Sequence, residues 1–208
     1  MKKTVIILST LAFIASSCRV QKYPTACDQG VEINGVRWAT RNVDKPGTFT
    51  KNPEDVGMFY QWNSKTGWST TDSLVSADGS TWDENWNGNN AEFWEITNNV
   101  CPEGWRIPTM KEFDKLTDAK IKWLRINGTY GCMLGSGKNK IFLPVAGVFS
   151  SGIYKAIDGY GGYWSSEVHN EEHVRALNFF GKDIYFGNVY RAGGFNIRCV
   201  AEYNNIEK

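Results

Sequence analysis

The sequence predicts an α+β fold in a single domain. An Asn-Gly turn between two alternating runs near residue 33 predicts a β-hairpin, and a capping box at Thr109 predicts one main helix. Beyond this helix, strand signals alternate with glycine-rich turns. The 208 residues are enough for one such domain and a leader, and 41% hydrophobic and 14% aromatic residues are typical of a packed core.

The first element is a hairpin within residues 31–43, with Asn34-Gly35 as its turn. A strand is predicted at residues 56–62. Residues 63–100 combine Asn, Ser, Thr, Asp and Gly with several Trp residues, which predicts a long loop region pinned by aromatic rings, with a short helix at residues 91–96. We expect the rings of this region to fill the core more readily than to form an exposed platform for sugars.

The main helix is predicted at residues 109–125. Thr109 is its N-cap, Glu112 completes the capping box, and an apolar stripe runs from Phe113 to Leu124. Beyond Asn127-Gly128 the pattern is that of antiparallel strands. They are predicted at residues 129–134, 140–148, 163–166, 174–180, 184–190 and 195–201.

Residues 1–17 predict a lipoprotein signal peptide. Lys2 and Lys3 precede an apolar core that is shorter than the roughly 20 residues needed to span a bilayer. Small residues directly before Cys18 resemble a bacterial lipobox, which implies cleavage before Cys18 and diacylation of its thiol. An ordinary secretory signal is the alternative. We therefore expect a lipidated Cys18 and tether (18–29) and a domain (30–203) anchored to the bacterial cell envelope, exposed at the outer membrane.

The net charge argues against nucleic-acid binding, and the cysteines indicate a disulfide. The formal net charge is +1, or about −1 without Lys2 and Lys3, and no basic stripe predicts nucleic-acid binding. An exported chain retains disulfides, and the remaining four cysteines allow three pairings. The strongly patterned contexts CPEGW and IRCV favour a Cys101–Cys199 bond. Cys27 and Cys132 then either pair or stay free.

Five pieces occur in order: INGVRWATRNV, CPEGWRIPTMKEFDKL, IFLPVAG, GYWSS and GFNIRCV. Together they resemble the Fibrobacter succinogenes major paralogous domain family, over about residues 30–200. The resemblance implies a C-type lectin-like fold, similar to the variable proteins of diversity-generating retroelements. Calcium-dependent lectins of this fold carry an EPN- or QPD-like tripeptide and a WND-like strand, and neither occurs here. Formylglycine-generating enzymes need a reactive cysteine pair, whereas Cys101 and Cys199 have structural contexts.

In the variable proteins, ligand contacts come from the segment between the YWSS-like and RCV-like strands. Mapped here, the segment is residues 167–191. Its apolar positions are expected to hold the scaffold: Val174, Ala176, Leu177, Phe179, Ile184 and Phe186. Its polar positions are expected to contact ligand: Glu167, His169, Asn170, Glu171, Glu172, His173, Arg175, Lys182, Asp183, Tyr185, Asn188, Tyr190 and Arg191. Among these, Tyr and Arg are the residue types enriched in binding hot spots.

The sequence gives less evidence for a catalytic or metal site than for a binding surface. His169 and His173 lie four residues apart, which on a helix could share a zinc ion, but their flanks are strand-like and no third ligand supports the site. Ser165-Ser166 lacks a G-x-S-x-G context, and no pair of carboxylates stands out. We therefore expect no enzyme, metal or cofactor, but a surface lipoprotein that binds an extracellular protein or glycan. The alternatives are an adhesin assembly subunit and a glycan-active enzyme.

Overall fold

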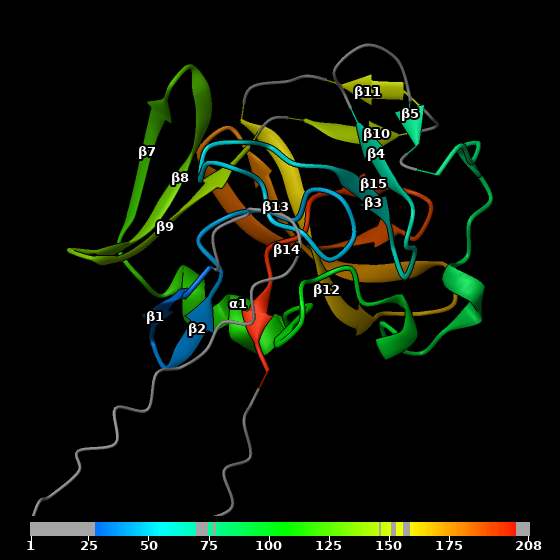
Figure 1. Cartoon of the computed structure of the whole chain (residues 1–208), viewed down its shortest axis with the longest axis horizontal. Coiled ribbons are helices and arrows are strands. Elements are labelled where there is room, and N and C mark those ends of the chain that lie inside the picture. The colour runs from blue at the N-terminus through cyan, green and yellow to red at the C-terminus, as the bar shows by residue number, and fades with distance from the viewer. Residues whose placement is uncertain are drawn as a thin grey trace, which may run out of the picture.

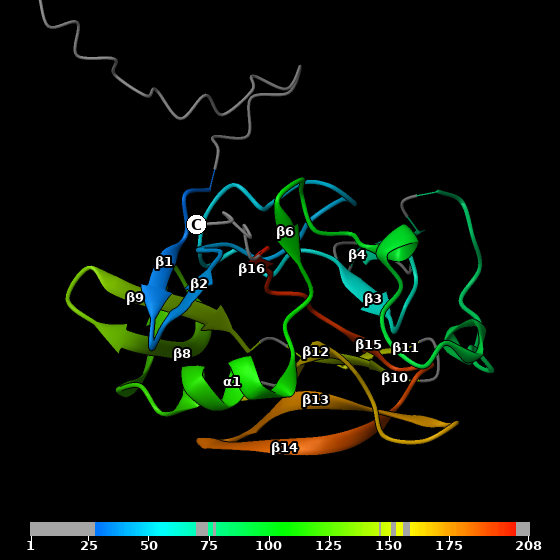
Figure 2. The same cartoon turned by 90° about the horizontal axis from the view of Figure 1, so that it is seen from below.

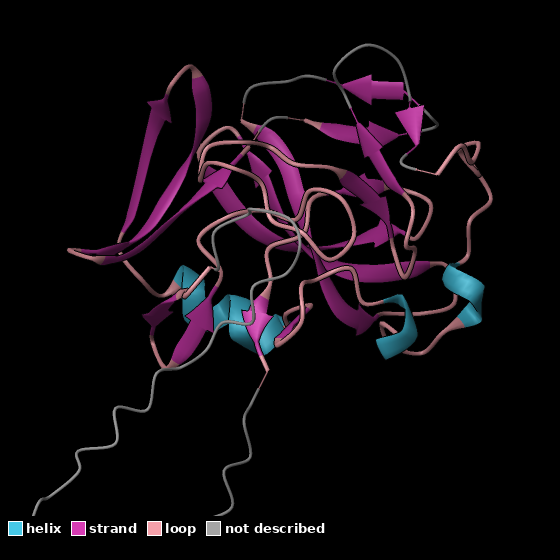
Figure 3. Cartoon of the chain, in the orientation of Figure 1, coloured by secondary structure: helices cyan, strands magenta, loops and turns pink. Residues whose placement is uncertain are grey.

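The structure is a computed structural model that describes residues 28–69, 75–76, 78–145, 147–150, 153–155 and 159–202. The predicted signal peptide and the lipidation site at Cys18 lie outside these residues, as does Cys27. Figure 1 and Figure 3 show a mostly β architecture. The described part of the chain has antiparallel strand pairs and one α-helix. The fold is therefore α+β, as predicted.

The Asn34-Gly35 dipeptide closes the predicted hairpin. β1 (Val31–Ile33) pairs antiparallel with β2 (Val36–Trp38), and Asn34 and Gly35 have φ of 49° and 77°. Positive φ at both central residues is what a type I′ turn requires, and this turn matches the twist of the flanking strands.

The other elements follow in chain order. They are β3 (Phe59–Gln61), β4 (Gly67–Ser69), β5 (Val75–Ser76), η1 (Gly88–Asn90), η2 (Ile96–Asn98), β6 (Trp105–Arg106), α1 (Met110–Thr117), β7 (Ile121–Ile126), β8 (Thr129–Ser136), β9 (Asn139–Pro144), β10 (Val148–Ser150), β11 (Ile153–Lys155), β12 (Tyr160–Val168), β13 (His173–Phe180), β14 (Asp183–Tyr190), β15 (Gly194–Phe195) and β16 (Val200–Ala201).

These strands form four sheets. Their orders are β1-β2-β16-β6, β11-β10-β15-β3-β4-β5, β12-β13-β14 and β7-β8-β9. In Figure 2, β14 runs along the lower border of the molecule beneath β13, while α1 lies above one end of these two strands. The sheet β7-β8-β9 projects to one side of the molecule in Figure 1.

The main helix begins as predicted but is much shorter than residues 109–125. Thr109 caps it and forms the full capping box with Glu112, whereas the helix ends at Thr117. Residues 121–126 form β7 instead, which pairs with β8 around the turn Asn127-Gly128. That turn has φ of 48° and 87°, so a second Asn-Gly hairpin replaced the predicted C-terminal half of the helix.

The short helix predicted at residues 91–96 is absent. The 3₁₀ turns η1 and η2 flank this stretch, and Phe93 forms a β-bridge with Glu167. The backbone N–H of Trp94 donates to the carbonyl oxygen of Ser166 at 3.1 Å. Because residues 93 and 94 are held extended beside β12, they cannot take helical dihedrals.

Two large apolar clusters lie on either side of β12 and β13. The first contains Trp62, Trp94 and Trp164, and the second contains Phe113 and Leu116 of α1. The prediction that the tryptophans of residues 63–100 fill the core is therefore confirmed for the buried Trp68 and Trp94. Trp82 and Trp86 of the same region are half-buried.

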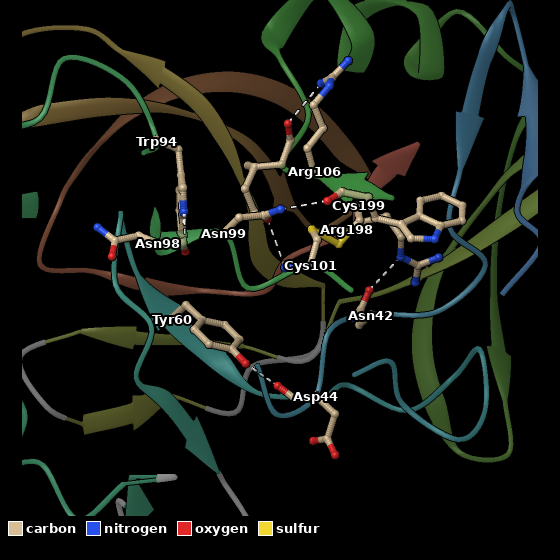
Figure 4. Close-up of a disulfide and its surroundings, with 12 residues drawn as sticks. Asn42, Asp44, Tyr60, Trp94, Asn98, Asn99, Cys101, Arg106, Arg198 and Cys199 are labelled. Atoms are coloured by element: carbon tan, nitrogen blue, oxygen red, sulfur yellow. Dashed lines mark hydrogen bonds between the residues drawn. A yellow bond between two sulfur atoms is a disulfide. The ribbon is translucent and has the colours of Figure 1, made fainter. Parts of the chain in front are cut away.

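The predicted Cys101–Cys199 disulfide is present, with its Cα atoms 6.1 Å apart. It lies beside the buried Arg198, whose Nε donates to Oδ1 of Asn42 (Figure 4). The Cys132 thiol is buried and free, so Cys132 forms no bond with Cys27. Burial raises the pKa of this thiol to about 12, which makes it an unreactive part of the second cluster.

Candidate ligand-binding surface

The segment predicted to contact ligand, residues 167–191, is a hairpin with a preceding loop. It includes the end of β12, a loop at residues 169–172, all of β13 and β14, and Arg191. β13 and β14 pair in unbroken antiparallel register, from His173 opposite Tyr190 to Phe180 opposite Asp183. Residues directly opposite each other lie on the same face of a sheet, so this register determines which side chains meet.

β13 holds the segment in place because it is buried on both faces. Val174 and Ala176 belong to the first apolar cluster, and Leu177 and Phe179 belong to the second. These four scaffold predictions are confirmed. Ile184 is half-buried against the second cluster, which also agrees with the prediction.

Phe186 was expected to hold the scaffold and does not. Its side chain is 43% exposed, although it lies opposite the buried Leu177. β14 is an edge strand of its sheet, and β13 is its one neighbouring strand among the described residues, so the residues of β14 are less covered than those of β13. Phe186 therefore belongs to the exposed surface.

Four of the predicted contact residues meet on one face, which we call the His173 face: His173, Arg175, Asn188 and Tyr190. His173 is opposite Tyr190 and Arg175 is opposite Asn188. The rings of His173 and Tyr190 contact each other, with centroids 4.3 Å apart, and Tyr190 is 65% exposed. The face combines a cation, an amide, a phenol and an imidazole, which suits a polar ligand.

Asp183 and Tyr185 lie on the opposite face of the hairpin because they occupy the alternate positions of β14. These two side chains therefore cannot contact the same flat ligand surface as the side chains of the His173 face. Tyr185 lies near Tyr160: partial burial and the Tyr160 phenol raise the pKa of the Tyr185 hydroxyl. Lys182 is exposed in the turn that joins β13 to β14.

The loop at residues 169–172 exposes His169, Glu171 and Glu172. Asn170 shapes this loop, because its Oδ1 accepts from the backbone N–H groups of Glu172 at 3.0 Å and His173 at 2.7 Å. The strand-like surroundings of His169 and His173 rule out the helical arrangement that a shared zinc ion would need.

Arg191 was expected to be displayed, and this is wrong because it is 3% exposed. Its Nη1 donates to the carbonyl oxygens of Asn87 at 3.1 Å and Ala91 at 2.8 Å, and its Nη2 donates to that of Asn170 at 3.0 Å. The guanidinium also lies 4.9 Å from the ring centroid of Trp62. Arg191 thus joins the loop before β13 to the η1 region as a structural residue.

Glu167 also has a structural contact. It is half-buried, and its Oε1 accepts from the backbone N–H of Met110 at 2.9 Å. Met110 is the first residue of α1, where N–H groups have no partner within the helix. Glu167 therefore ties the start of the segment to the helix, and a carboxylate is favoured at that position.

Sequence reasoning missed a pocket of about 330 Å³ beside β14. Glu84 carries the one charge among the described residues that line it. The lining consists of Trp82, Glu84, Val148, Phe149, Tyr160, Asn188, Val189, Tyr190, Ala192, Gly193 and Phe195. These residues come from four distant parts of the chain, so no local pattern could have revealed the pocket. The one available signal was the Trp-rich stretch that supplies Trp82.

The described residues contain no group of three or more His, Cys, Asp or Glu side chains placed to hold a metal ion. No helix among them is long and apolar enough to cross a membrane. When the chain is compared with models of protein families, with curated proteins and with solved structures, none of the three comparisons finds a match.

Proposed function

We propose that this chain is a surface-anchored binding module with a C-type lectin-like domain. It recognises an extracellular protein or glycan through residues 167–191. The observation that carries the proposal is the organisation of the β13–β14 hairpin. Val174, Ala176, Leu177 and Phe179 of β13 are buried in the two clusters, whereas Arg175 and most of β14 expose polar and aromatic side chains.

Rigidity supports this proposal. A binding surface on a fixed scaffold loses little conformational entropy when a ligand binds. Arg191 fixes the loop before β13, Glu167 fixes the end of β12 to α1, and the Cys101–Cys199 bond closes the chain around the hairpin. The exposed side chains of the hairpin can therefore differ without changing the core beneath them.

The proposed anchor is a diacylated Cys18 that holds the domain at the outer membrane, facing outward. The lipobox-like residues before Cys18 support it. Metabolic labelling of a bacterial host with an alkyne fatty acid tests the anchor. The unaltered chain should become labelled, and the Cys18→Ala variant should not.

The function itself is tested by binding. The purified chain is applied to an array of glycans and extracellular proteins, in parallel with a His173→Ala, Arg175→Ala double variant. Loss of binding by the double variant with an unchanged Tm supports the proposal, because both side chains lie outside the apolar clusters. A Lys122→Ala, Lys138→Ala variant on the β7-β8-β9 sheet is the matched control, since both lysines are exposed.

Equal binding by the double variant and the control would contradict a ligand site on the His173 face. Turnover of an arrayed glycan that one carboxylate substitution abolishes would instead establish an enzyme.

A further inference from the structure

The outer edge of β14 has no partner strand in the described part of the chain. β14 pairs with β13 alone and is the last strand of its sheet. The two-residue turn Gly181-Lys182 makes Phe180 and Asp183 a hydrogen-bonded pair, after which such pairs alternate along the hairpin. The N–H of Arg191 donates to the carbonyl oxygen of Glu172 at 3.2 Å, which agrees with this alternation.

The alternation determines which backbone groups point away from β13. The N–H and C=O groups of Ile184, Phe186 and Asn188 point to the outer edge, together with the N–H of Tyr190. The carbonyl oxygen of Tyr190 accepts from Gly193. The outer edge therefore carries donors and acceptors at the fixed spacing of a β-strand.

This edge also lacks the features that usually prevent strand addition. Proteins protect edge strands with charged residues, proline or bulges. Residues 184–190 contain no charge and no proline, and their register with β13 is unbroken. β7, an edge strand of another sheet, differs because it carries the exposed Lys122 and Arg125.

The pocket beside β14 lies where side chains of an added strand would reach. Val189 and Tyr190 line it from β14, and Phe149, Phe195 and Trp82 supply apolar surface. Alternate side chains of a strand point to the same face, so an added strand would direct one or two of them into the pocket. Glu84 at the pocket would favour a neighbouring positive charge.

We propose that β14 binds an extended segment of a partner polypeptide as a fourth strand of the sheet β12-β13-β14. The segment places a large apolar side chain in the pocket and a Lys or Arg side chain beside Glu84. This inference rests on the proposed binding function and names its ligand class. In such complexes main-chain hydrogen bonds supply affinity, and pockets for alternate side chains supply specificity.

Two observations favour a partner polypeptide over other occupants. A glycan has no regular row of N–H and C=O groups to match those of Ile184, Phe186 and Asn188. A second copy of β14 would bring no positive side chain between Asp183 and Arg191, and Glu84 would stay unmatched.

The test uses a phage library of random nonapeptides selected on the purified chain. Selected peptides should alternate apolar or β-branched residues with others, and should carry one large apolar residue and a Lys or Arg. Binding of the selected peptides is then measured to the unaltered chain and to a Phe186→Pro variant, which was not used in the selection. Proline there removes an outward N–H without removing a bond to β13, and edge strands tolerate such prolines.

The best peptide is then N-methylated at one position at a time. Methylation should weaken binding about fivefold or more at every second residue and have little effect at the residues between, because only alternate N–H groups face β14. This N-methylation experiment uses the unaltered chain, so its result does not require any protein variant to fold. The exposed Glu84→Lys variant should reverse the preference from basic to acidic peptides.

The proposal is overturned if no peptide is enriched, if N-methylation acts without the period of two, or if selected peptides bind the Phe186→Pro variant equally well at an unchanged Tm. It is also overturned if the chain dimerises and Phe186→Lys makes it monomeric, because a second copy would then occupy the edge. If no peptide is enriched but binding to the array still depends on His173 and Arg175, the proposed function holds and this inference alone is overturned.

Discussion

Arg198 shows how a single residue holds distant parts of the fold together. Its side chain is fully buried, and its guanidinium donates to Oδ1 of Asn42 at 2.9 Å and to the carbonyl oxygens of Ala39 at 3.1 Å and Phe142 at 2.9 Å. Burial lowers the pKa of this guanidinium, but a guanidinium stays charged at neutral pH. The hydrogen bonds therefore replace its lost hydration.

Arg198→Met should lower the free energy of unfolding by about 3 kcal/mol or more, because it leaves three buried acceptors unpaired. Urea denaturation of both chains measures the difference. Arg175→Met is the matched control: this guanidinium is exposed, and its loss should change stability by less than about 0.5 kcal/mol. Equal effects of the two substitutions would contradict a structural role for Arg198.

Glu112 gives the stability a predictable pH dependence. Burial by itself would raise the pKa of this carboxyl, but hydrogen bonds from Arg106 and Thr109 and the Arg106 charge outweigh it, and the pKa is lowered. A lowered folded-state pKa stabilises the fold at pH values above the ordinary glutamate pKa of about 4.5. That contribution is lost as the pH falls through the lowered value.

Glu112→Gln should therefore reduce Tm at pH 7, and the difference from the unaltered chain should shrink as the pH is lowered toward 3. Thermal unfolding followed by circular dichroism at several pH values checks this. A gap in Tm that stays constant across the range would mean that Glu112 acts through packing alone.

At the scale of elements, the turns and caps were the predictable part. Asn34-Gly35 and the Thr109–Glu112 box have local physical causes, and both appear where the sequence places them. The predicted helix is too long because the apolar positions Leu116, Trp123 and Leu124 fit a helical stripe, whereas Trp123 and Leu124 belong to β7 of the hairpin around Asn127-Gly128. The pocket and the burial of Arg191 depend on long-range packing, which local patterns do not encode.

Arg191 links two loops that belong to different parts of the chain, and its replacement should destabilise both loops. Arg191→Met removes the donors to Asn87, Ala91 and Asn170, and should destabilise the chain by about 2–3 kcal/mol. Hydrogen–deuterium exchange should quicken at residues 87–91 and 168–172 more than in β8 and β9. The exposed Lys182→Met is the control, and uniform quickening throughout the chain would contradict a local link.

At the scale of the whole molecule, the segment predicted to bind ligand is also part of the core. β13 separates the two apolar clusters, and Trp164 of β12 packs on Phe195 with ring centroids 4.7 Å apart. The exposed surface of the hairpin is therefore carried by a strand whose Val174, Ala176, Leu177 and Phe179 are buried in these clusters. Substitutions of the exposed Arg175 should leave the fold intact, whereas substitutions of Val174, Ala176, Leu177 or Phe179 should unfold the chain.

The Cys101–Cys199 bond joins the middle of the domain to the residue before β16, and residues separated by 98 positions become neighbours. In the chain-entropy account, closing a loop of this size restricts the unfolded chain and contributes about 4–5 kcal/mol. β16 pairs with β2, near the start of the domain, and with β6, near its middle. The bond therefore helps to hold β16 between these two strands.

A Cys101→Ala, Cys199→Ala double variant should therefore unfold about 3–5 kcal/mol more easily in urea than the oxidised chain. Reduction of the unaltered chain with dithiothreitol should produce a similar loss, and the same reductant should leave the double variant unchanged. This comparison separates the cross-link from the packing of the two side chains, since reduction keeps both sulfur atoms in place. If reduction had no effect while the double variant lost stability, the contribution of these cysteines would come from packing, and the cross-link would not be what restricts the chain.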